Sequence, residues 1–149
     1  MRNTFLFSIL ILLLVLLLAS CGKDKFNTTP TLKYKSVNKK ILGRFDGDLV
    51  FTLSFTDAEG DLDGTLTIIK QVSLCLNGTD GGFVAPYEVP EFSSGKNQKG
   101  DFLVTFGYND IGPKCPNRND TAIFKFVLQD KAQHVSDTAV SEPIILIKN

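Results

Sequence analysis

The chain has 149 residues, of which 16 are lysine or arginine and 16 are aspartate or glutamate, so its formal net charge is zero. A chain of this length can bury one hydrophobic core but not two. Its balanced charge argues against nucleic acid or an anionic lipid surface as partner, because both attract strongly basic chains. The composition therefore indicates one small domain.

The N-terminus has the layout of a secretion signal. Arg2 supplies a positive charge, and residues 5–19 form an almost unbroken apolar run. This run is shorter than the roughly 20 apolar residues that a membrane-spanning helix needs. It ends in Leu18-Ala19-Ser20-Cys21, which resembles the lipobox, where bacterial lipoproteins are cleaved just before a lipidated cysteine. We therefore expect residues 1–20 to be a signal peptide and Cys21 to carry the lipid; the alternative is an uncleaved anchor.

A short tether is expected behind this cysteine. Residues 21–30 are this cysteine and a tether, because residues 22–30 are polar and unpatterned and close with Pro30, as in a flexible linker. Residues 31–149 then form the folded domain. Two or more acyl chains hold a protein stably on a membrane, so we expect a lipid-anchored protein. Enterobacterial lipoproteins that stay at the inner membrane carry an aspartate directly after the lipidated cysteine. This chain has Gly22 there, so we expect the outer membrane. Whether the domain faces the periplasm or the cell surface stays open.

The other two cysteines are expected to pair. With Cys21 lipidated, Cys75 and Cys115 remain, and an oxidising compartment favours a disulfide between them. Closing this loop would contribute about 4 kcal/mol in the chain-entropy model. A zinc site is the competing interpretation. Two distant cysteines, a single His134 and no Cys-x-x-Cys motif argue against zinc.

Alternating apolar and polar residues predict strands with one face in a core. No stretch carries a sustained helical period. Strands are expected at residues 31–37, 49–55, 65–74, 83–89, 101–108, 120–130 and 140–148. About seven short strands indicate an all-β fold, an antiparallel β-sandwich of the immunoglobulin-like (Ig-like) or fibronectin-like kind.

A count of strand directions places the loops. If successive strands run antiparallel across the domain, the loops after Phe55 and Leu128 meet at the end where the tether enters. Cys75 and the loop of Cys115 then share the opposite end. The predicted disulfide therefore needs no rearrangement of the strands.

The tether end holds an acidic cluster. Four carboxylates alternate through a turn that contains two glycines, and a fifth lies at the end of the strand at 120–130. The five residues are Asp57, Glu59, Asp61, Asp63 and Asp130. Calcium takes six to eight oxygen ligands in proteins, and close carboxylates repel one another unless a cation or solvent neutralises them. We expect a calcium site here; the alternative is a solvated acidic turn. An EF-hand is excluded, because Leu62 stands where a loop starting at Asp57 needs glycine.

A family resemblance supports this site. Residues 55–64, Phe-Thr-Asp-Ala-Glu-Gly-Asp-Leu-Asp-Gly, resemble the "ftDgDGDlG" loop of Bacteroidetes lipoproteins of unknown function. Further matching segments extend the resemblance over most of residues 31–147. It implies an Ig-like or cadherin-like sandwich with a cation site in the Asp-rich loop. Glu59 replaces the usual aspartate, and Gln133-His134 replace a usual Gly-Asn.

No residue pattern indicates catalysis. His134 has no partnered nucleophile in the sequence, and a paired-carboxylate hydrolase using Asp61 and Asp63 has no other support. We expect a non-enzymatic envelope lipoprotein that serves in binding or structure, with an envelope protein or glycan as partner. The alternative is a carbohydrate-binding or adhesin accessory. An exposed row of aromatic side chains would favour this alternative; the candidates are Tyr34, Phe83, Tyr87 and Phe92.

Overall fold

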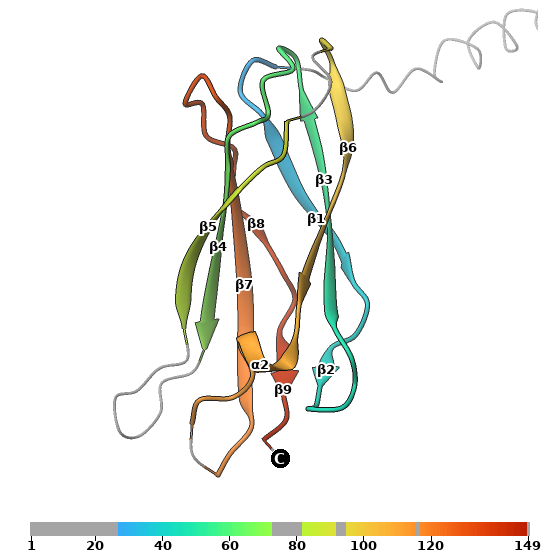
Figure 1. Ribbon diagram of the computed structural model, residues 1–149, viewed down its shortest axis with the longest axis vertical. Helices are drawn as coiled ribbons and strands as arrows, with labels where there is room; N and C mark the ends of the chain where they lie inside the picture. The colour runs from blue at the N-terminus through green and yellow to red at the C-terminus, as the bar shows by residue number, and fades with distance from the viewer. Residues whose placement is uncertain (1–26, 73–81, 92–94, 116, 149) are drawn as a thin grey trace, which may run out of the picture.

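Two β-sheets make up the part of the chain that the computed structural model describes, namely residues 27–72, 82–91, 95–115 and 117–148. This part contains nine strands and one short helix (Figure 1). Their bounds are β1 Thr31–Val37, β2 Ile41–Leu42, β3 Leu49–Asp57, β4 Thr65–Val72, β5 Phe83–Glu88, β6 Gln98–Phe106, α2 Tyr108–Ile111, β7 Asp120–Gln129, β8 Ala139–Val140 and β9 Ile144–Leu146.

The sheet topology confirms the predicted two-sheet all-β architecture. The smaller sheet has the order β1-β3-β6, and both of its strand pairs are antiparallel. The larger sheet has the order β2-β9-β7-β4-β5, with β8 paired to β7. Among the strands of the described residues, only β2 and β9 pair in parallel, and the other pairs of this sheet are antiparallel.

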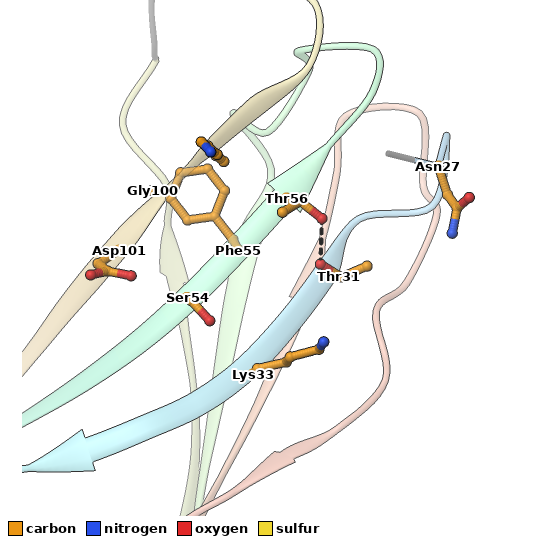
Figure 2. Close-up of a pocket in the computed structure, with 9 residues that line it drawn as sticks. Asn27, Thr31, Lys33, Ser54, Phe55, Thr56, Gly100 and Asp101 are labelled. Carbon is orange, nitrogen blue, oxygen red and sulfur yellow. Dashed lines mark hydrogen bonds between the residues drawn. The ribbon is translucent and has the colours of Figure 1, made fainter. Parts of the chain in front are cut away.

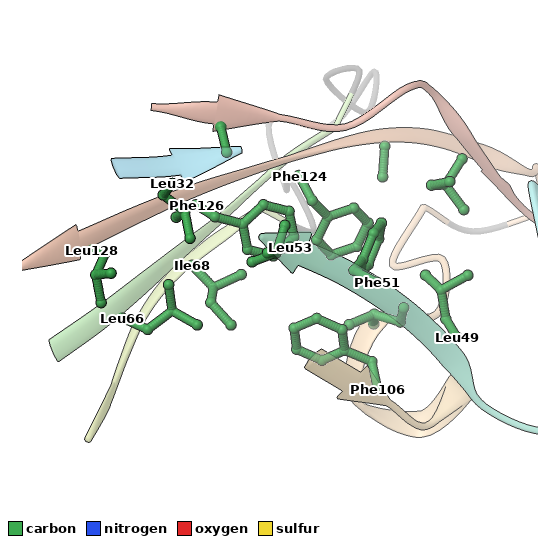
Figure 3. Close-up of a cluster of buried hydrophobic side chains, with 14 of the residues drawn as sticks. Leu32, Leu49, Phe51, Leu53, Leu66, Ile68, Phe106, Phe124, Phe126 and Leu128 are labelled. Carbon is green, nitrogen blue, oxygen red and sulfur yellow. The ribbon is translucent and has the colours of Figure 1, made fainter. Parts of the chain in front are cut away.

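Strand β3 shows how the sequence builds the core. Its apolar residues Leu49, Phe51, Leu53 and Phe55 are buried, and the residues between them are partly exposed. The centroid of the Phe51 ring lies 4.8 Å from that of Phe124 and 5.3 Å from that of Phe126, both on β7. The two sheets therefore pack face to face (Figure 3), and each such side chain contributes roughly 1.5–3 kcal/mol by its burial.

The predicted strands are right in their centres and differ at their ends. β6 occupies Gln98–Phe106 instead of 101–108, because the chain turns into α2 after Gly107. The predicted strand 140–148 is divided into β8 and β9. Ser141 lies at this break, and its hydroxyl accepts a hydrogen bond from the backbone N–H of Phe124 at 2.9 Å. Residues 73 and 74 of the predicted third strand lie outside the described residues.

The loop positions follow the predicted strand directions. The loop after β3 and the turn after β7 lie at one end of the domain, at the top of Figure 1. The backbone N–H of Lys131 donates to the carbonyl oxygen of Asp61 at 3.0 Å. The N–H of Ala58 donates to the carbonyl oxygen of Asn27, also at 3.0 Å, so the start of the described chain is bound to the same loop.

Several predicted features fall outside the described residues. These are the signal peptide at 1–20, the lipidated Cys21 and one partner of the predicted disulfide, Cys75. Cys115 is buried, and its pairing with Cys75 stays a prediction. Within the described residues, no helix is long and apolar enough to cross a membrane.

A lysine is buried in the larger sheet. Lys70 of β4 follows Leu66 and Ile68 on the inward row of its strand, and it is 2% exposed. Its Nζ donates a hydrogen bond to the carbonyl oxygen of Ile111 at 2.7 Å. Burial lowers the Lys70 pKa to about 8, and the nearby Asp120 carboxylate offsets part of this shift. The charged ammonium therefore costs stability in the folded state.

This lowered pKa predicts a rise in stability with pH. Between pH 8 and 10 the unfolded chain keeps the Lys70 proton while the folded protein loses it, so the free energy of unfolding should rise by about 1 to 3 kcal/mol. Denaturant titrations at pH 7, 8, 9 and 10 measure the effect. Lys70→Met removes the titrating group and should abolish this rise. A wild-type curve that is flat over this range, or one that Lys70→Met leaves unchanged, would contradict the assignment.

Candidate metal centre

Asp57 places a carboxylate inside the end of the domain. It ends the inward row of β3 after Leu53 and Phe55, and it is 0% exposed. Its Oδ2 accepts a hydrogen bond from the backbone N–H of Gly60 at 2.6 Å. Its Oδ1 is buried and has no hydrogen-bond partner. A buried acceptor without a donor destabilises the fold, because it loses its hydrogen bonds to water and gains no replacement.

The loop that follows Asp57 is held closely against its neighbours. Gly60 has a φ of +79°, and a Cβ at this position would clash with the carbonyl oxygen of Gly95. Leu62 is buried in the core. A Cβ at Gly64 would clash with the carbonyl oxygen of Gln129 at the end of β7. The two glycines thus let the loop approach both neighbouring segments, and Leu62 anchors it between them.

Two more aspartates approach Asp57. Asp61, in the same loop, is partly exposed, but its Oδ1 is buried and has no hydrogen-bond partner. Asp130, directly after β7, is 0% exposed. One carboxylate oxygen from each of Asp57, Asp61 and Asp130 lies within 4.8 Å of the other two. These residues, the three-Asp group, form a buried cluster that can hold a metal ion.

His134 fixes the orientation of Asp130. The His134 backbone N–H donates to Asp130 Oδ1 at 2.8 Å, and its Nδ1 lies 3.0 Å from Asp130 Oδ2. The turn between them requires Gln133 to adopt a φ of +71°. Glycine is the residue that adopts this conformation at least cost, and Gln133 is not glycine. The sequence did not indicate that His134 binds Asp130, because Gln133 carries no turn signal.

The electrostatics of the three-Asp group favour a cation. Two unit negative charges within 4.8 Å of each other would repel by roughly 3 kcal/mol or more at an effective dielectric constant of 20. The group contains three such pairs. A divalent cation would replace this mutual repulsion with attraction and would supply the missing partner of both buried oxygens.

The other two predicted ligands lie outside the three-Asp group. Glu59 is exposed at the loop surface. Asp63 binds the Nζ of Lys131 at 2.9 Å. This hydrogen bond lowers the Asp63 pKa and raises the Lys131 pKa. The structure therefore brings together three of the five predicted residues and gives Asp63 a different partner.

The aromatic residues proposed for a glycan platform do not form one row within the described chain. Tyr34 lies on the smaller sheet and Tyr87 on the larger. Burial, together with the hydrogen bond that the Tyr34 hydroxyl donates to Glu142 at 3.1 Å, raises the Tyr34 pKa to about 12. Phe83 packs against the core, and Phe92 lies outside the described residues.

Comparison of the chain with protein families, with curated proteins and with solved structures finds no match. The resemblance to Bacteroidetes lipoproteins therefore stays a prediction. The two-sheet fold and the three-Asp group are properties of the structure itself.

The close fit of the acidic loop predicts a strong effect at Gly60. Gly60→Ala should lower the free energy of unfolding by at least about 2 kcal/mol, because it adds a backbone clash to the cost of a positive φ. Gly47→Ala is the matched control, since Gly47 has a φ of +72° but nothing within 4 Å of the point that a Cβ would occupy. This control should lose only about 1 kcal/mol. Equal losses in urea denaturation would mean that the Gly60–Gly95 contact contributes nothing.

Proposed function

We propose that this protein is a non-enzymatic lipoprotein of the bacterial cell envelope, anchored through Cys21 to the outer membrane. Its domain, which we take to be Ig-like, would bind or support other envelope components. The anchor is supported by the sequence Leu18-Ala19-Ser20-Cys21 and by the polar residues that follow it. The proposed disulfide between Cys75 and Cys115 suits the same oxidising compartment.

We further propose calcium as the ion of the three-Asp group. The observation that carries this proposal is the fully buried Asp57 carboxylate, whose Oδ1 has no hydrogen-bond partner. A set of carboxylate ligands suits hard cations. Calcium binds with flexible geometry and can take its remaining oxygen ligands from backbone carbonyls and water. Calcium is also abundant outside the cytoplasm, so a site of modest affinity would be filled.

The proposed role of the ion is structural. Asp57 and Asp61 belong to the loop after β3, whereas Asp130 belongs to the turn after β7. An ion shared by these residues would link the two sheets at the end where the tether enters. Because Asp57 and Asp130 are fully buried, their carboxylates are poorly placed to act on a substrate.

Calcium should stabilise the protein by a measurable amount. At a free concentration one hundred times the dissociation constant, one site adds about 2.7 kcal/mol, which should raise the melting temperature by at least about 5 °C. Differential scanning fluorimetry with calcium and with EGTA measures this shift. Asp57→Asn should abolish it, whereas the matched control Asp63→Asn should retain it, because Asp63 binds Lys131 instead. Identical melting temperatures with calcium and with EGTA would contradict a calcium site.

The anchor has its own test. Protein purified from its native host should lack residues 1–20 and carry acyl chains on Cys21, as intact-mass spectrometry measures. Cys21→Ala should remain unacylated and leave the membrane fraction. An intact leader, or an unmodified Cys21 thiol on a cleaved chain, would contradict the anchor without bearing on the calcium site.

The glycan-binding alternative has less support. It calls for an exposed aromatic platform, and Tyr34 and Tyr87 lie on different sheets. The envelope module with a structural cation is therefore the function that we retain.

A further inference from the structure

The outer face of the larger sheet is apolar. In β7, Ala122, Phe124 and Phe126 are buried in the core, so the residues between them point outward. Residues that lie opposite one another in the strand register share a face of the sheet, so this outer face extends onto the neighbouring strands. Its aliphatic members, which we call the outer aliphatic face, are Ile41, Ile69, Val84, Ile123, Val127, Val140 and Ile145.

Much of the outer aliphatic face is accessible to solvent. Val84 is 67% exposed, Ile41 53% and Val140 47%. Val84 lies on β5 and Ile41 on β2, the two outermost strands of the larger sheet. Exposed apolar surface therefore extends from one edge of the sheet to the other. Contiguous exposed apolar surface, unlike single exposed aliphatic residues, marks an interaction site.

The smaller sheet shows the pattern of a sheet with one solvated face. On its outer side, Lys33 of β1 lies opposite Ser54 of β3. Thr31 lies opposite Thr56, and their hydroxyl oxygens are 2.6 Å apart. Figure 2 shows these polar side chains along the two strands. An antiparallel sheet with one face in water carries polar residues there. The larger sheet departs from this rule, so we expect its outer face to be covered.

The chemistry of the outer aliphatic face favours another sheet as its partner. All of its members are valine or isoleucine, and side chains of two facing sheets interdigitate at a separation of about 10 Å. Within the described residues, the strands place no aromatic side chain on this face, because Phe83 and Tyr87 lie on the inward row of β5. Glycan platforms and membrane-interface segments are rich in aromatic side chains, so neither is the favoured partner.

The charges of the face allow that sheet to belong to a second copy of the chain. The charged strand residues on this side of the described sheet are Lys125 of β7 and Glu88 at the end of β5. Their charges are opposite, so two copies of the face do not repel each other through net charge. The aliphatic stem of Lys125 can add to an apolar contact while its ammonium group reaches the rim.

The face is large enough for a dimer of moderate affinity. Its five strands, spaced by about 4.8 Å and about six residues long, cover roughly 24 by 20 Å. Two such faces would bury roughly 1,000 Å² in total, which is the lower limit for a specific protein–protein interface. A twofold axis would bring the same patch of both copies together.

We propose that two copies of this protein associate through their outer aliphatic faces. The larger sheets would then face each other in the middle of the dimer, and the smaller sheets would keep their polar outer faces in water. This association rests on the side chains of the larger sheet alone. It requires neither the lipid on Cys21 nor an ion in the three-Asp group.

Sedimentation equilibrium of the full chain tests this association. Protein purified from its native host, in a density-matched detergent with micelles in excess, should change from monomer to dimer between about 1 and 100 μM. In the Val84→Glu/Val140→Glu variant the dissociation constant should rise at least about tenfold, because carboxylates would lose their hydration in the interface. Leu103→Glu is the matched control, since Leu103 is 69% exposed on the outer face of the smaller sheet. It should keep the wild-type dissociation constant.

Hydroxyl-radical footprinting shows which face is covered. In the wild-type protein, oxidation of Val84 and Val140 relative to Leu103 should fall several-fold over the same range of concentration. Mass spectrometry of the peptides measures these ratios. Because this measurement needs no variant, it decides the question even where the double variant does not fold.

Each other outcome would overturn the proposal. A chain that stays monomeric, with constant oxidation of Val84 and Val140, would show that the face remains in water. A dimer in which both valines stay reactive would use another surface. A monomer in which they are protected at every concentration would have something other than a second copy on this face. None of these results bears on the lipid anchor or the calcium site.

Discussion

The burial of Asp57 is the constraint on which this end of the domain depends. Alternate residues of β3 point into the core. Asp57 follows Leu53 and Phe55 in this row, so its carboxylate is buried as well. Removing an unpaired carboxylate from water costs several kcal/mol, against a total stability of about 5–15 kcal/mol for a typical domain. The residues around it add negative charge, since Asp61 and Asp130 lie within 4.8 Å. A divalent cation at the three-Asp group would resolve this conflict.

The surrounding loops hold this arrangement through backbone contacts. Gly60 and Gly64 allow the loop to lie directly against Gly95 and Gln129. The same loop binds Asn27 through the N–H of Ala58. An ion at the three-Asp group would therefore stabilise both the junction between the sheets and the point where the chain enters the domain.

The sequence predicted the strand centres and the meeting of Asp57, Asp61 and Asp130, because both follow from two-residue alternation and antiparallel directions. It also placed Glu59 and Asp63 in the site, which assumed that alternation continues through the loop. β3 ends at Asp57 and the chain bends at residues 58 and 59, before the positive φ of Gly60, so the alternation does not reach Glu59. Glu59 is exposed, and Asp63 binds Lys131. The short strand β2 was missed because two residues show no period.

X-ray diffraction can test directly whether the three-Asp group binds calcium. Crystals grown with calcium and measured at a wavelength where calcium scatters anomalously should show a peak among Asp57, Asp61 and Asp130. We expect the ion at about 2.3–2.6 Å from one oxygen of each carboxylate. Ordered water without anomalous density, or the Lys131 ammonium turned into that position, would contradict a calcium site.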